Sequence, residues 1–203
     1  MSDDSSLRSR LEPLLTYLDA TDFPKIARRY FALNFFDGVL TMMGFTMGYY
    51  MVGGRDPNPI FGAGVAASVA MGLSGFVGAL MTEIAERERE IHELERNMFK
   101  DLDNTMIARS QKIAAVLIAL IDAVAPALGA LILAIPLAHP LVDLLGYDYA
   151  VLVSVSIGLA ALFTLGSFLG AVSSKGRMVR YGLTMLLTGV ALALVTAMMG
   201  VAL

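Results

Sequence analysis

Long apolar runs separated by short polar segments dominate this chain. Each run has 20 or more residues, enough for a helix to cross a hydrocarbon core of about 30 Å. The runs lack the strict alternation of barrel strands, and lipid offers no hydrogen-bond partner to other backbone structures. The pattern therefore predicts an all-α, polytopic membrane protein with five transmembrane helices. These spans cover about residues 31–52, 60–82, 113–138, 149–172 and 178–200.

Two polar segments are also compatible with helices. Residues 1–25 contain leucines at helical spacing between Ser6 and Leu18, with charge on the other side, which predicts an amphipathic helix on the cytoplasmic membrane surface. Residues 83–110 are highly charged and contain no Gly or Pro, so we expect a Glu-rich cytoplasmic helix that continues the second span. Residues 26–203 then form one five-helix transmembrane domain.

The basic residues predict the orientation. Of 15 Lys and Arg, five precede the first span, one follows it, six lie between spans two and three, and three lie in or next to the connection between spans four and five. The positive-inside rule then places the N-terminus and the Glu-rich helix in the cytoplasm and the C-terminus outside. Compact loops and the lack of a targeting segment indicate a prokaryotic plasma membrane.

Composition narrows the chemistry further. The chain is 57% hydrophobic and 16% charged, and its net charge of -3 averages two sides of a membrane, so nothing indicates a nucleic-acid partner. It has no cysteine and therefore no disulfide or thiolate metal site. Phosphate-binding loops, zinc-protease motifs and nucleophile motifs are absent from the sequence, so we expect no enzyme and no cofactor.

An acidic residue inside the first span is the most informative feature. Inserting Asp37 costs about 3 kcal/mol or more, so such a side chain usually serves a function or turns inward to a partner. Helical spacing places it on a polar and small face, whose Gly44-x-x-x-Gly48 pair would let another helix or a second protomer approach. We expect this face to be a transport path and a homodimer contact. Its predicted path residues are Asn34, Asp37, Thr41 and Met47.

A second carboxylate lies inside the third span. Asp122 stands four residues before Pro126, which lacks the amide that would bond the carbonyl of residue 122. A side-chain carboxylate and a free backbone oxygen at one point would suit a hard or borderline cation. A Pro-kinked helix without any site is the alternative interpretation.

Glutamates and methionines supply the remaining candidate ligands. Glu83, Glu86, Glu90 and Glu93 fall on one stripe of the cytoplasmic helix, which indicates either a metal-collecting surface or a solvated helix whose glutamates pair with arginines. Among 13 methionines, Met43 and Met71 are predicted metal ligands because thioethers bind late first-row metals weakly.

The segments FFDGVLTMMGFTMG, GLSGFVGALMTEIAERE and GSFLGAVSSKGRMVRYGLTMLLTGVALALVTAMMG resemble the vacuolar iron transporter family. The resemblance implies five helices, a homodimer, a Glu-rich cytoplasmic segment after helix two, and an aspartate of helix one, Asp37 here, in the ion pathway. The chain resembles a divergent member with a short cytoplasmic metal-binding segment. Phe36 stands where the family has asparagine, and Ser74-Gly75 stands where the family has Ser-Met, with Met71 one turn earlier.

Together these observations predict a homodimer that exports Fe²⁺ or Mn²⁺ from the cytoplasm by exchange with protons, with lipid as its surroundings. A carboxylate that binds either a metal ion or a proton couples the two flows. Two alternatives remain open: a metal-responsive membrane scaffold that does not transport, and an intramembrane enzyme acting on lipid through Asp37 and Asp122.

Overall fold

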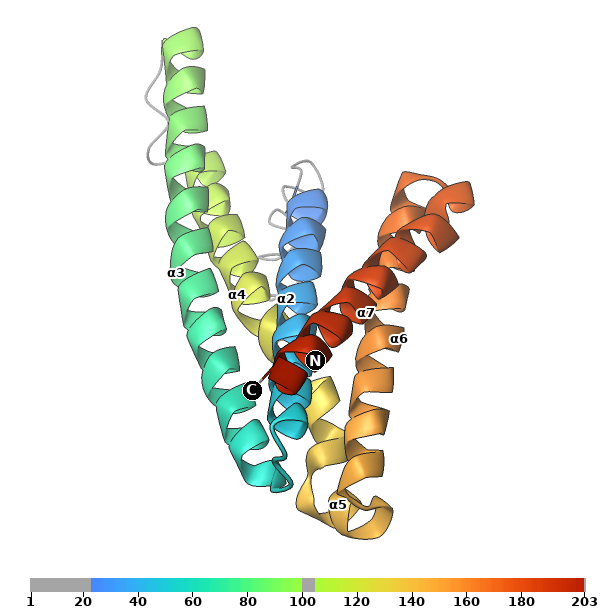
Figure 1. Cartoon of the computed structure of the whole chain (residues 1–203). Coiled ribbons are helices and arrows are strands. Elements are labelled where there is room, and N and C mark those ends of the chain that lie inside the picture. Colours follow the sequence, from blue (N-terminus) through green and yellow to red (C-terminus); the bar gives the residue numbers. More distant parts are fainter. Residues whose placement is uncertain (1–22, 100–104, 203) are drawn as a thin grey trace, which may run out of the picture. The chain divides into compact units, whose positions relative to one another are not determined.

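The computed structural model describes residues 23–99 and 105–202, and within them every regular element is a helix (Figure 1). The long helices are α2 (Phe23–Met51), α3 (Pro57–Met98), α4 (Met106–Ala134), α6 (Tyr147–Ser173) and α7 (Met178–Ala202). The short ones are η1 (Ile135–Leu137), α5 (His139–Leu145) and η2 (Lys175–Arg177). The predicted all-α class is confirmed, whereas the predicted interfacial helix between Ser6 and Leu18 lies outside the described residues.

Among the described residues, four helical segments are long and apolar enough to cross a membrane. They are α3, Ser110–Leu137, α6 and Met178–Gly200. The chain is therefore an integral membrane protein, as predicted. Helix α2 is not among these four, since its apolar run is interrupted by Asn34 and Asp37, and the fifth span stays a prediction.

The chain divides into two compact units, and α2, α3 and α4 each contribute residues to both. The first unit contains residues 73–123 and the beginning of α2 up to Phe31. The second contains residues 32–72 and everything from Val124 onward.

In the first unit, α3 continues from its apolar half into its charged half without a break. It is a single helix of 42 residues that ends at Met98, not at residue 110 as the sequence suggested. The end has a backbone cause, because Phe99 adopts a left-handed φ of 51°, which no helix can continue through. Residues 106–110 belong to the start of α4.

In the second unit, α2 and α4 cross with their backbones in direct contact. A Cβ added at Gly38 would collide with the Pro126 backbone, and one at Gly129 would lie 2.5 Å from the Phe35 carbonyl oxygen. Only glycine permits this approach. The crossing stands beside an apolar core to which α2, α3, α4 and α6 contribute. The largest side chains of this core are Met42, Met43, Ile60, Leu133, Leu137 and Leu162.

Glycines also bring α6 and α7 together as a hairpin. A Cβ at Gly166 would lie 2.5 Å from the Tyr181 carbonyl oxygen, and one at Gly170 would lie 2.7 Å from the Met178 Cα. Because the opposing atoms belong to the backbone, they cannot rotate away from a larger residue. These two contacts fix where α7 begins relative to α6.

Candidate metal sites

The face of α2 that carries Asp37 is the least covered side of this helix within the second unit. Val39, Met42, Met43 and Thr46 are buried, whereas Asp37 is exposed and Thr41, Gly44 and Gly48 are only half-buried. Asn34, one turn before Asp37, is also half-buried. The structure therefore separates an apolar face, which packs into the core, from a polar and small face, as the helical spacing predicted.

Methionine 71 of α3 meets this polar face. The Thr41 hydroxyl donates a hydrogen bond to the Met71 sulfur over 3.8 Å, and both side chains are partly buried. Thr41 follows Asp37 by four residues, so it stands one turn along the same face of α2. A carboxylate, a hydroxyl and a thioether are thus contributed by two helices to one side of α2.

The other predicted methionine ligand lies elsewhere. Met43 is completely buried, and its sulfur packs where a Cβ on Gly158 of α6 would come within 2.7 Å. Met43 thus points into the core, away from the face that carries Asp37. Met47 is half-buried one turn further along α2.

In the glycine pair of α2, Gly44 is open and Gly48 faces α7. A Cβ on Gly44 would meet nothing within 4 Å, and one on Gly48 would meet only the Thr196 methyl group at 3.9 Å. The described part of this chain therefore does not use the Gly44-x-x-x-Gly48 pair for close packing. Gly38 and Gly129, which the sequence analysis did not single out, hold the close helix crossing instead.

Asp122 occupies a second site, in the first unit. Its side chain is only 4% exposed and turns toward α3, where a Cβ on Gly75 would lie 2.5 Å from the Asp122 Oδ2 and 3.5 Å from its carbonyl oxygen. Both oxygen types that the sequence placed at this point therefore face Gly75. Because Gly75 has no side chain, it leaves the space into which the carboxylate extends.

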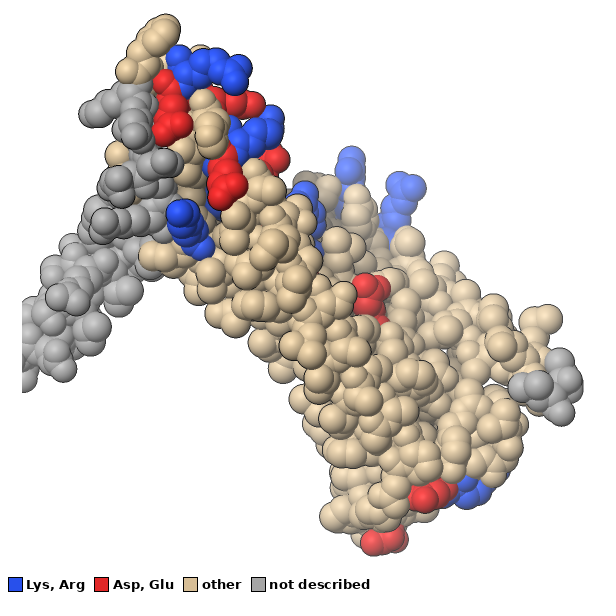
Figure 2. Space-filling view, turned by 90° about the vertical axis from the view of Figure 1, so that its left-hand side faces the viewer, with Lys and Arg blue, Asp and Glu red and all other residues tan. Residues whose placement is uncertain are grey.

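The Glu-rich stripe lies on the charged half of α3, where Figure 2 shows acidic and basic side chains intermingled. Glu83 is buried and forms an ion pair with Arg87 at 3.3 Å. Glu86 and Glu93 both pair with Arg89, at 2.6 and 2.9 Å. Glu90 is exposed. The stripe predicted from the sequence is present, and arginines are interleaved with it.

These arginines change the acidity of the stripe. Hydrogen bonds and the positive charge of Arg89 hold the pKa of Glu86 below its usual value, which keeps this carboxylate ionised and ready to accept a cation. A metal ion that bound Glu86 would have to compete with Arg89 for it. Both side chains are more than half exposed, so this competition costs little.

Within the described residues, no three His, Asp or Glu side chains gather closely enough to hold a metal ion. Asp37 has Thr41 and Met71 one turn along the same side of α2, and Asp122 has its own carbonyl oxygen beside it. A small ligand set of this kind would suit passage of an ion better than its storage.

Comparison with known proteins gives one relative. The chain is 30% identical over 175 residues to "Uncharacterized protein MJ0645" of Methanocaldococcus jannaschii, an alignment that covers 84% of this chain and 86% of the relative. No protein-family model matches the chain, and no solved structure matches it.

Proposed function

We propose that this chain, which belongs to the same protein family as the uncharacterized protein MJ0645, is a homodimeric transporter of divalent metal ions. It moves Fe²⁺ or Mn²⁺ out of the cytoplasm in exchange for protons. The observation that carries this proposal is the exposed carboxylate of Asp37, on a polar face of α2 that its own unit leaves open.

The exposure of Asp37 supports the dimer. An uncompensated carboxylate facing lipid costs about 3 kcal/mol or more, so this face of α2 needs a cover. The open Gly44 beside it would accept a helix of a second copy at close range. In a twofold dimer the same face meets itself, and the two Asp37 carboxylates then lie on either side of the axis.

Such a pairing would also complete the metal coordination. One chain offers one carboxylate and one thioether at this place, and two chains offer two of each. Carboxylate and thioether together suit the borderline ion Fe²⁺, and the two carboxylates also suit the harder Mn²⁺. When the ion leaves, the closely spaced carboxylates would take up protons, which couples the two flows.

The remaining acidic residues define an expected route. The glutamates of α3 would collect the ion on the cytoplasmic side, and Asp122 with its carbonyl oxygen would bind it within the membrane. The basic residues at the charged end of α3 favour a cytoplasmic position for that end, and a prokaryotic plasma membrane fits the compact loops.

The experiment that tests this proposal is uptake of Fe²⁺ and Mn²⁺ by proteoliposomes under an imposed pH gradient. We expect Asp37→Asn to abolish flux while the protein stays folded and dimeric. Asp143→Asn is the matched control, because it makes the same chemical change at an exposed position of α5. We expect it to leave flux unchanged.

The outcomes distinguish the alternatives. Flux that persists in Asp37→Asn at matched incorporation would remove Asp37 from the mechanism. If a folded and dimeric protein moves no divalent ion at all, the proposal fails and a metal-responsive scaffold becomes the better account. Flux lost equally in both variants would show that the assay reports damage to the protein.

A further inference from the structure

The α6–α7 hairpin carries an unbalanced positive charge. Lys175, Arg177 and Arg180 are the only charged residues from Tyr149 to Leu203. Arg177 and Arg180 are exposed, and no Asp or Glu among the described residues forms an ion pair with either. The one acid of α6, Asp148, lies at the opposite end of that helix and pairs with Arg55 at 3.7 Å. The end of the hairpin at η2 therefore presents cationic groups without an acidic partner among the described residues.

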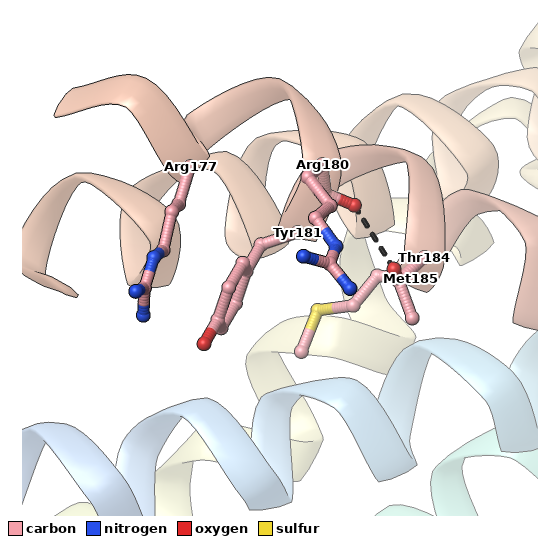
Figure 3. Close-up of a pocket in the computed structure, with 5 residues that line it drawn as sticks. All are labelled: Arg177, Arg180, Tyr181, Thr184 and Met185. Carbon is pink, nitrogen blue, oxygen red and sulfur yellow. Dashed lines mark hydrogen bonds between the residues drawn. The ribbon is translucent and has the colours of Figure 1, made fainter. Parts of the chain in front are cut away.

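These arginines line a cavity of about 340 Å³ on one face of α7. The lining residues are Arg177, Arg180, Tyr181, Thr184 and Met185, which recur at helical spacing. Figure 3 shows the side chains of Arg177, Tyr181, Arg180 and Met185 extending from the same side of the helix. The Thr184 hydroxyl donates its proton in a hydrogen bond to the Arg180 carbonyl oxygen at 2.9 Å, so it is not counted as a donor to a ligand.

The position of this cavity in the bilayer follows from the hairpin. Both α6 and α7 are long and apolar enough to span the membrane, so η2, which connects them, lies at a membrane surface. Met185 follows Arg177 by eight residues, which corresponds to about 12 Å along a helix. The cavity thus runs from cationic and phenolic groups at the surface to an apolar side chain at the depth of the acyl chains.

Neither arginine has an acidic partner among the described residues, and Arg177, at the end of η2, donates only a long hydrogen bond of 3.4 Å to the Ser173 hydroxyl. The N-terminal turn of a helix favours negative charge, yet α7 has no acidic residue there and Arg180 occupies that turn. The contacts of Gly166 and Gly170 with the backbone at Tyr181, Arg177 and Met178 fix the backbone from which these side chains extend. An anion bound here would offset both the paired cationic charge and the helix dipole.

We propose that this cavity binds the phosphate group of an anionic phospholipid. Guanidinium groups match phosphate oxygens with paired hydrogen bonds, and the Tyr181 hydroxyl adds a third donor. A lipid also explains the apolar depth of the cavity, which a soluble anion would leave unfilled. Juxtamembrane basic clusters attract anionic headgroups for the same electrostatic reason.

The test uses the full chain, purified and stripped of lipid in detergent, and measures retained lipid by native mass spectrometry and thermal stability. Phosphatidylglycerol, phosphatidylcholine and inorganic phosphate are added separately. We expect phosphatidylglycerol alone to be retained and to raise Tm. Arg180→Gln should weaken retention about tenfold, the effect of losing one charge-assisted hydrogen-bonding group.

Two further variants make the result specific. Arg96→Gln removes the same charge from the exposed end of α3 and should leave retention unchanged. Arg180→Lys keeps the charge but not the planar pair of donors, and it should fold normally and still bind more weakly than the native chain. Equal losses in Arg96→Gln and Arg180→Gln would overturn the proposal, as would equal stabilisation by phosphatidylcholine or by inorganic phosphate alone.

Discussion

Gly75 and Asp122 form a contact whose purpose can be tested one residue at a time. The carboxylate occupies the space that any side chain at position 75 would take, since a Cβ there would lie 2.5 Å from Oδ2. Asp122 is also buried, so it cannot move into solvent without disturbing its surroundings. The position of the carboxylate therefore requires a glycine at position 75.

We predict that Gly75→Ala destabilises the protein by about 1–3 kcal/mol, the usual cost of overpacking, and displaces Asp122. Thermal unfolding in detergent measures the stability, and metal flux measures the effect on the site. Gly78→Ala is the matched control on the same helix, because a Cβ there would meet nothing within 4 Å. Adding Asp122→Ala to Gly75→Ala should restore stability but not flux. If Gly75→Ala and Gly78→Ala change the thermal stability equally, the close contact between Gly75 and Asp122 does not constrain the fold.

At the scale of helices, the glycines of α2 fall into two classes. Gly38 packs directly on the Pro126 backbone, whereas Gly44 faces open space. Helical spacing places them on different faces of α2, but it does not show which face packs against a helix of the same chain. Gly38 therefore permits close helix packing within the chain, whereas Gly44 remains available to contact another molecule.

We predict that a larger side chain at Gly38 affects the stability of the fold, whereas one at Gly44 affects the dimer. Gly38→Ala should destabilise the folded chain by several times the roughly 1 kcal/mol by which alanine favours a helix over glycine, because backbone atoms cannot yield. Gly44→Leu should leave the fold intact but weaken the dimer. Thermal unfolding and light scattering in detergent measure the two properties separately. A dimer that tolerates Gly44→Leu would place the protomer contact on another face.

The sequence predicted the helices well and the contacts between them poorly. Apolar runs marked the long helices, and the polar face of α2 followed from spacing alone, because helical period and hydropathy are local properties. The end of α3 at Met98 was missed, since Phe99 carries no glycine-like signal for its left-handed backbone. The Thr41–Met71 and Gly75–Asp122 contacts depend on how separate helices pack, which no local pattern encodes.

Candidate ligands show the same limit. Spacing correctly placed Glu83, Glu86, Glu90 and Glu93 on one helix, but it could not decide between metal binding and pairing with arginine. The ion pairs of Glu86 and Glu93 with Arg89 depend on side-chain conformations, which helical spacing does not determine. Similarly, Met43 and Met71 are equal in the sequence, and only packing distinguishes a core residue from one that contacts the polar face.

For the whole molecule, the path of α2 decides the topology. Helix α3 is one of the four membrane-capable segments, so its charged end and its beginning lie on opposite sides of the bilayer. If α2 also crosses, the residues at its start share a side with the charged end of α3. If α2 does not cross, they share a side with the connection between α2 and α3. Asp37 lies within the membrane only in the first case.

The absence of cysteine allows this question to be answered directly, because a single introduced thiol will be the only one in the chain. We predict that Lys25→Cys and Arg96→Cys are protected from a membrane-impermeant thiol reagent in intact cells, whereas Asp143→Cys in α5 is labelled. All three positions are exposed in the structure. Permeabilised cells provide the control, since all three should then react equally. Labelling of Lys25→Cys in intact cells, with Arg96→Cys still protected, would mean that α2 does not span the membrane, and Asp37 could then not bind an ion in transit.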